Sequence, residues 1–152
     1  MMVRPTTEQL LLDCCRELME GILPAVSDQT AIVRIFMVEQ VLKNAAVRAA
    51  HEISWITEEI PQIEAYARAV LAVADRAQLR NQLDRLAQTA DAGLDLDPLV
   101  ERYARASEAL STALEIAVTE ELTDLRRRGE QLVQARHDRE TTVMAGWSPT
   151  GR

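Results

Sequence analysis

The sequence predicts an all-α fold, an antiparallel bundle of four to five helices with two long helices. Apolar residues make up 47% of the 152 residues and recur at steps of three and four, the spacing that lines one face of a helix. Glycine and proline number five each, so long stretches contain no helix breaker. No segment shows the alternating pattern of a strand. We therefore expect one helical domain over residues 1–140 and a flexible tail over 141–152.

The first helix is expected to begin after Thr6. Thr6 and Gln9 form a capping-box pattern, in which each side chain bonds the backbone N–H of the other residue. The helix should run to about Gly21, because glycine commonly follows a helix end. Cys14 and Cys15 are adjacent and lie about 100° apart on such a helix, so a disulfide between them would be strained. We expect two reduced thiols, at least one of them buried.

The central helix is expected between Asp28 and Ile60, a stretch without glycine or proline. Asp28 can cap its start, and Pro61 should end the helical hydrogen-bond ladder because its ring removes a donor. Met37 and Trp55 lie on a mostly polar face, which indicates a second contact with another helix or a partner subunit. The opposite, buried face is predicted to contain Ile32, Ile35, Leu42, Ala46, Ala49, Ile53, Ile56 and Ile60.

The helical pattern resumes directly after Pro61, and residues 63–92 form either one bent helix or two. Asp97 and Pro98 then predict a helix start, an N-cap followed by proline at the first helical position. From there the pattern continues to about Glu140. Its apolar row shifts by one residue at Val118, as a straight helix does against a near-heptad pattern. The polar part from Arg126 onward is expected to extend beyond the bundle or to pair in a dimer.

The overall charge excludes some functions. A formal net charge of −7 argues against a general nucleic-acid-binding protein, which needs a positively charged surface. No run approaches the roughly eighteen apolar residues of a membrane span, and residues 1–7 lack the apolar core of a signal peptide. We therefore expect a cytoplasmic protein that binds no nucleic acid and does not span a membrane.

Signatures of known enzymes are missing from the sequence. A di-iron bundle needs Glu-x-x-His on two helices, but Arg48 and Gln134 stand three residues before His51 and His137. Two histidines without a Cys-x-x-Cys motif do not support a zinc site. A phosphate-binding glycine loop and a nucleophile elbow are also absent. The sequence therefore predicts no metal, no cofactor and no catalytic residue, and it favours a non-enzymatic protein.

One candidate ligand site lies on the central helix. Glu39 is close to the apolar face, where a carboxylate requires a cation or a ligand. With Lys43, Arg48 and Glu52 it can line a charged pocket between helices for an anionic ligand. Helical mutases of the chorismate type use such inward charges, but the ordered spacing of their charged residues is absent from this sequence. The alternative interpretation is surface ion pairing, because Glu39 and Lys43, and likewise Arg48 and Glu52, are one turn apart.

A candidate partner site lies near the C-terminus. Arg126, Arg127 and Arg128 form a basic cluster that can dock an acidic partner. The simpler interpretation is that cations near a helix C-terminus complement the helix dipole.

Two short regions carry a resemblance to a known family. Arg4-Pro5-Thr6, with Glu8, Leu10 and Leu11 and then Ile22-Leu23-Pro24, resembles the opening of a small bacterial all-helical family of unknown function. The run Leu94-Asp95-Leu96-Asp97-Pro98 is similar to a late signature of that family. Its members are typically encoded beside aminoglycoside-phosphotransferase-like kinases and acyl-CoA dehydrogenases. The resemblance implies an accessory partner of an acyl-CoA or phosphotransfer enzyme and implies no catalytic residue.

These observations predict a homodimeric, non-catalytic accessory or interaction protein. The alternative is a small-molecule-binding protein or enzyme that uses the charged pocket around Glu39, Lys43, Arg48 and Glu52.

Overall fold

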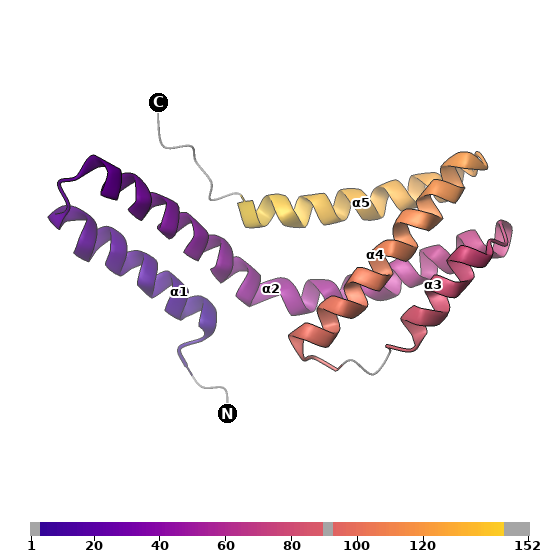
Figure 1. Ribbon diagram of the computed structural model, residues 1–152, viewed down its shortest axis with the longest axis horizontal. Coiled ribbons are helices and arrows are strands. Elements are labelled where there is room, and N and C mark those ends of the chain that lie inside the picture. Colours follow the sequence, from indigo (N-terminus) through magenta and orange to yellow (C-terminus); the bar gives the residue numbers. More distant parts are fainter. Residues whose placement is uncertain (1–3, 90–92, 145–152) are drawn as a thin grey trace. The chain divides into compact units, whose positions relative to one another are not determined.

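The computed structural model describes residues 4–89 and 93–144 and confirms the all-α bundle fold. Contacts group the chain into two compact units, where the sequence predicts a single domain. We call Met1–Glu52 with Arg139–Arg152 the hairpin unit and Ile53–Asp138 the four-helix unit. The elements are α1 (Thr7–Arg16), a π-helix (Glu17–Ile22), a 3₁₀ turn (Leu23–Ala25), α2 (Gln29–Val73), α3 (Ala77–Ala87), α4 (Leu96–Thr119) and α5 (Thr123–Met144) (Figure 1).

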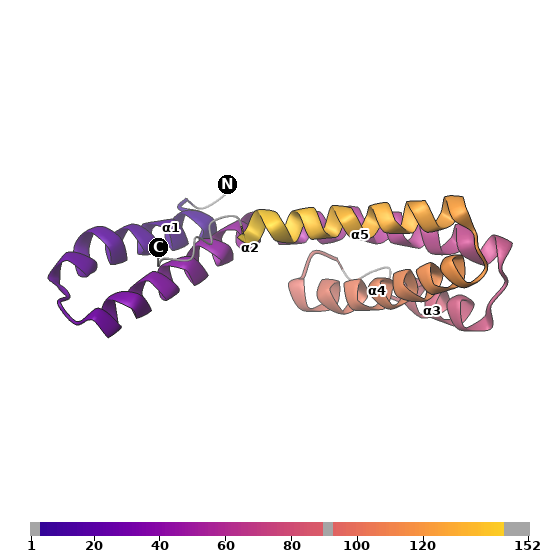
Figure 2. The same ribbon diagram turned by 90° about the horizontal axis from the view of Figure 1, so that it is seen from above.

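In the hairpin unit, α1 lies antiparallel to the first part of α2 (Figures 1 and 2). The predicted capping box is confirmed, because the backbone N–H of Gln9 donates to Thr6 Oγ1 at 3.2 Å and that of Thr6 donates to Gln9 Oε1 at 2.9 Å. Asp28 caps α2 by accepting the backbone N–H of Ala31 at 2.9 Å. Both helix starts in this unit therefore follow from local capping chemistry.

The four-helix unit contains the hydrophobic core. The second part of α2 is followed by α3, α4 and α5, which alternate in direction, and α3 packs on α4 (Figures 1 and 2). Short connections favour such antiparallel neighbours. One connected cluster of buried side chains joins α2, α3 and α4: Ile56, Ile60, Ile63, Tyr66, Ala67, Val70, Leu79, Leu83, Leu86, Leu99, Ala106, Ala109, Leu110 and Ala113.

Helix α2 continues through Pro61 to Val73, so the predicted helix end at Pro61 is wrong. A proline inside a helix costs about 3 kcal/mol. Ile60 and Ile63 on either side of it are buried in the core, and each contributes about 1.5–3 kcal/mol by burial. Pro61 itself is exposed. The packing of its neighbours therefore outweighs the local preference of the proline, and the break falls between Val73 and α3.

The predicted single helix from Asp97 to Glu140 is two helices, α4 and α5. Glu121 has a φ of 55°, and its backbone N–H donates to Val118 O at 3.2 Å. The next N–H, of Leu122, donates to Ala117 O at 2.9 Å. These two bonds form a Schellman motif, which ends a helix and commonly has glycine at the left-handed position. The one-residue shift of the apolar row at Val118 therefore marks a turn rather than slippage within a helix.

Two further boundaries differ from those expected. The N-cap of α4 is Asp95 rather than Asp97. Helix α5 extends to Met144, with Val143 buried, so residues 141–144 belong to a helix. The remainder of the predicted tail, 145–152, lies outside the described residues. Helix α5 belongs to the four-helix unit as far as Asp138, with Gly129 buried, and its residues from Arg139 onward belong to the hairpin unit.

Candidate functional site

The residues of the predicted ligand site form two separate ion-paired groups. Lys43 pairs with the buried Glu39. Arg48 pairs with Glu52 at 3.6 Å and, more closely, with Glu140 of α5 at 2.8 Å. Glu39 and Arg48 are nine residues apart, which places them about half a turn apart around the helix. The structure therefore brings each pair together but directs the two pairs to different faces of α2.

Glu39 lies at the contact between α1 and α2. The Cys15 thiol donates to the Glu39 backbone carbonyl at 3.6 Å, and Cys15 is buried whereas Cys14 is exposed. Burial raises the pKa of the Cys15 thiol, the Glu39 carboxylate adds to this rise, and Lys43 opposes it. Both thiols are free, as predicted. Cys15 is therefore a protonated packing residue near neutral pH rather than a reactive thiolate.

The predicted basic cluster is exposed at the start of α5. Arg126 pairs with Glu130 at 2.7 Å and Arg127 with Asp124 at 3.8 Å. An open depression of about 510 Å³ lies beside the α4–α5 turn and is lined by Val118, Glu121, Thr123, Arg126, Arg127 and Glu130. Charges of both signs line it. The cluster lies near the N-terminus of α5, so it does not complement a helix C-terminus as one interpretation of the sequence suggested.

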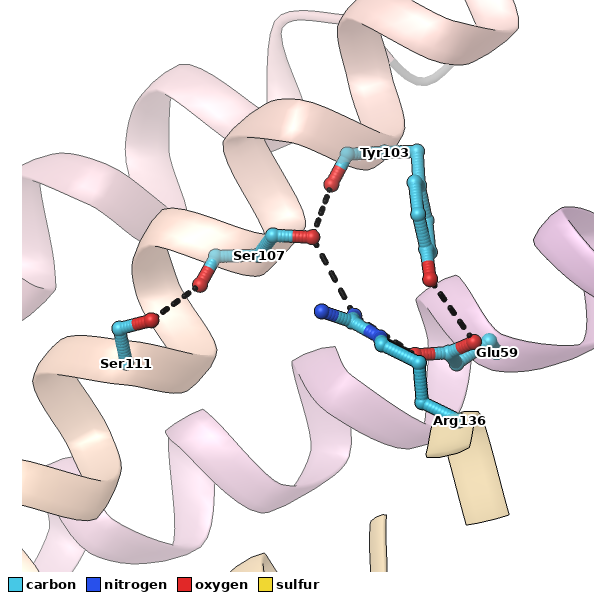
Figure 3. Close-up of polar contacts among 5 residues, drawn as sticks. All are labelled: Glu59, Tyr103, Ser107, Ser111 and Arg136. Atoms are coloured by element: carbon cyan, nitrogen blue, oxygen red, sulfur yellow. Dashed lines mark hydrogen bonds and ion pairs between the residues drawn. The ribbon is translucent and has the colours of Figure 1, made fainter. Parts of the chain in front are cut away.

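A partly buried polar cluster around the buried Glu59 of the four-helix unit was missed by the sequence predictions (Figure 3). Glu59 of α2 is 5% exposed, and its Oε1 accepts from Nε and lies 2.7 Å from Nη2 of Arg136 on α5. Its other oxygen accepts from the Tyr103 hydroxyl of α4 at 3.0 Å. Arg136 also donates to Ser107 Oγ at 3.2 Å and lies 4.9 Å from the centre of the Tyr103 ring. We call Glu59, Tyr103, Ser107 and Arg136 the Glu59 cluster.

The Glu59 cluster joins three helices through one carboxylate. A buried charge requires a partner, and the guanidinium supplies charge-assisted hydrogen bonds together with a cation–π contact to Tyr103. Ser107 in turn donates to the Tyr103 backbone carbonyl at 2.9 Å, so its hydroxyl can accept from Arg136 without losing its own donation. The arrangement positions α5 against α2 and α4. Its side chains bond one another, which is typical of a cluster that stabilises helix packing.

The sequence contained a signal for this cluster. Glu59 is three residues after Ile56 and four before Ile63, so it falls on the buried face of α2. Arg136 is four residues after Leu132 and therefore extends the apolar row of α5. A charged residue at a position where the helical period predicts an apolar one indicates a buried charge that needs an oppositely charged partner. Which two charges meet could not be read from the period.

An exposed apolar stripe runs along α2 in the hairpin unit. Val33, Met37 and Val41 are spaced four residues apart, so they share one face of the helix. Their exposed fractions are 50%, 64% and 66%. Ile35 and Glu39, in contrast, lie on the side of α2 that is less exposed. We call Val33, Met37 and Val41 the Met37 stripe.

The hairpin unit has little buried apolar core to compensate for this exposure. Among its described residues, the buried apolar side chains are those of Cys15, Ala46 and Val143. This contrasts with the fourteen residues of the core cluster in the four-helix unit. Scattered exposed apolar residues are normal on protein surfaces, whereas the three residues of the Met37 stripe follow one another along one helix face.

Other kinds of site find no support within the described residues. No group of three or more histidine, cysteine, aspartate or glutamate side chains there is arranged to hold a metal ion. In the same part of the chain, every helix is too short or too polar to cross a bilayer.

No family model, curated protein or solved structure matches the chain.

Proposed function

We propose that this protein is a non-catalytic, cytoplasmic accessory protein that works by binding other proteins. The observation that carries this proposal is the Met37 stripe, which exposes three large apolar side chains in the unit that has the smaller core. Helices that expose such a row associate with other helices, because association removes the row from water. The stripe supports self-association, in agreement with the homodimer predicted from Met37.

The partner enzyme is a separate part of the proposal. The family resemblance implies a phosphotransferase-like kinase or an acyl-CoA dehydrogenase as the partner. We assign its docking site to Arg126, Arg127 and Arg128, which are exposed beside the open depression at the α4–α5 turn. Exposed arginines form bidentate contacts with carboxylates, so the matching surface on the partner is acidic.

The placement of charges favours binding of proteins over binding of a small anion. A ligand pocket around Glu39, Lys43, Arg48 and Glu52 would require these groups to converge. Glu39 and Arg48 instead lie about half a turn apart, and each cation already has a carboxylate partner. Binding an anion there would first require both pairs to open.

Co-purification from the native host tests the proposed function. The tagged full-length chain should recover a kinase of the phosphotransferase type or an acyl-CoA dehydrogenase, identified by mass spectrometry. The double variant Arg127→Glu/Arg128→Glu should reduce that recovery at least tenfold. Arg80→Glu is the matched control, because Arg80 is also exposed and paired with an aspartate in the same unit. Equal recovery with all three proteins, or recovery of neither enzyme, would contradict the partner assignment.

A further inference from the structure

We propose that the Met37 stripe is covered by a second copy of this chain, with the two α2 helices antiparallel about a two-fold axis at Met37. This inference rests on the proposed function and names the partner at one of its two surfaces. It also fixes the direction and register of the pairing, which the proposed function does not.

The first argument is the symmetry of the stripe. Val33 and Val41 are each four residues from Met37, and Thr30 and Asn44 are each seven residues from it. In an antiparallel pair centred on Met37, Val33 of one copy lies against Val41 of the other. Thr30 likewise lies against Asn44, so polar residues without charge close both ends. A two-fold interface requires one surface patch that is complementary to itself, and this stripe has that property.

The second argument is the charge along the seam. Arg48 is eleven residues from Met37 and therefore lies on nearly the same face of α2. A parallel pair in register would bring Arg48 against Arg48 of the second copy, whereas the antiparallel register places Arg48 level with Val26. Like charges directly across an interface are unfavourable, and they exclude wrong pairings. The charges therefore select the antiparallel direction.

The third argument is the distribution of charge between the two units. By sequence, the hairpin unit has seven basic and eight acidic residues, whereas the four-helix unit has ten basic and sixteen acidic residues. Two copies that met through their four-helix units would bring two strongly acidic surfaces together. Contact through the nearly neutral hairpin unit involves much less repulsion. A second copy is therefore best accommodated on the unit that carries the Met37 stripe.

The fourth argument is what the hairpin unit gains. Among the described residues of the hairpin unit, α1 and α2 bury one apolar residue each, Cys15 and Ala46, and α5 adds Val143. This core is small, and most helical stability in proteins comes from packing of an apolar face. A second hairpin placed on the exposed face of α2 supplies a further helix layer. The four helices α1 and α2 of the two copies then have the composition of a four-helix bundle. The Met144 sulfur lies 3.9 Å from Asn44, so in the two-fold pair this half-exposed side chain adds apolar surface at both ends of the seam.

Disulfide trapping tests the axis directly. In a full-length Cys14→Ser/Cys15→Ala background whose circular dichroism matches the wild type, Met37→Cys should form a covalent dimer under mild oxidation. Only residues at a two-fold axis approach their own copies closely enough for a disulfide. A mixture of the Val33→Cys and Val41→Cys chains should give at least fivefold more disulfide-linked dimer than either chain gives by itself. Val118→Cys, about half exposed on α4, is the matched control and should stay monomeric.

Light scattering separates failure of this inference from failure of the proposed function. At high micromolar concentration the wild type should have about twice the 17.0 kDa chain mass, and Met37→Glu should return it to one chain. A wild-type monomer would overturn the inference, while co-purification of the partner enzyme would still stand. A dimer in which Val33→Cys and Val41→Cys each trap themselves but not each other would also overturn it, because that outcome requires a parallel pair. Such a result would leave the stripe as an interaction surface.

Discussion

The Glu59 cluster makes an unequal prediction for its two charged partners. Arg136→Met keeps the aliphatic stem of the side chain but removes the guanidinium from Glu59, whose side chain is 7% exposed. Breaking a buried pair from one side costs about 3–5 kcal/mol because the other charge stays buried. The Arg136 side chain is 30% exposed, so water partly replaces it, and we expect a cost of about 3 kcal/mol, the lower end of that range.

Removal of the carboxylate should cost less. In Glu59→Met the guanidinium can turn toward solvent and the apolar side chain fills the buried position, so we expect a loss of about 1–2 kcal/mol. The double variant Glu59→Met/Arg136→Met leaves no buried charge and should lie within about 1 kcal/mol of the wild type. The coupling energy between the two positions is then about 3–5 kcal/mol, well above the few tenths expected for independent sites. Arg136→Lys is the control that keeps the charge but loses the planar contact with Tyr103.

The measurement is urea unfolding of the four single and double variants at neutral pH, followed by far-ultraviolet circular dichroism. The free energies of unfolding are compared from the urea concentrations at the unfolding midpoints, with one common slope of free energy against urea concentration. The reasoning is refuted if Arg136→Met costs less than Glu59→Met. It is also refuted if the double variant is no more stable than Arg136→Met, since the buried carboxylate would then not be the source of the cost.

Three further predictions concern Gly129, Tyr66 and Glu121. Gly129→Ala should destabilise the protein by about 2 kcal/mol, because a Cβ there would meet Tyr66 Oη at 2.5 Å and Leu114 Cδ1 at 2.7 Å. The cost of this overpacking exceeds the roughly 1 kcal/mol by which alanine is favoured over glycine in a helix. The loss should be smaller in a Tyr66→Phe background, which removes a buried hydroxyl that has no hydrogen-bond partner among the described residues. Burial raises the pKa of Tyr66, so this side chain ionises at lower pH in the unfolded chain and the free energy of unfolding falls above about pH 10. In Tyr66→Phe, unfolding titrations should no longer show the part of this fall that Tyr66 causes. Glu121→Gly should raise the unfolding free energy by about 1 kcal/mol, because glycine adopts a φ of 55° without strain, whereas Glu121→Val should lower it.

Local chemistry in the sequence predicted the helix starts that depend on it. The capping box at Thr6 and Gln9 and the cap at Asp28 are formed by side chains within three residues of the bonds they make. The helix ends were harder to predict, because they depend on distant contacts or on an unusual residue. Pro61 is tolerated through the burial of its neighbours, and the α4–α5 turn has Glu121 at a position where glycine is the ordinary signal.

In the candidate sites, too, local spacing was predictable from the sequence, whereas contacts between distant residues were not. Periodicity alone could have separated Glu39 from Arg48, because nine residues make two and a half turns of a helix. It could have marked Glu59 and Arg136 as charges on apolar faces but could not have paired them, since they are 77 residues apart and belong to helices whose facing sides are set by packing. The partner of Arg48 was missed for the same reason. Glu52 is one turn away on the same helix, but the closer contact is made by Glu140.

The residue types of the Met37 stripe add an argument for a covered surface. Valine is a weaker helix former than alanine, lysine or glutamate, because its branched side chain loses rotamer freedom against the preceding turn. At a solvated helix position it costs a few tenths of a kcal/mol and exposes apolar area in addition. The two valines of the stripe, Val33 and Val41, are 50% and 66% exposed. Both costs disappear when another helix packs on this face, since branched side chains then fill the space between helices. Valines at these positions are therefore favourable in a two-fold helix contact and unfavourable on a permanently solvated face.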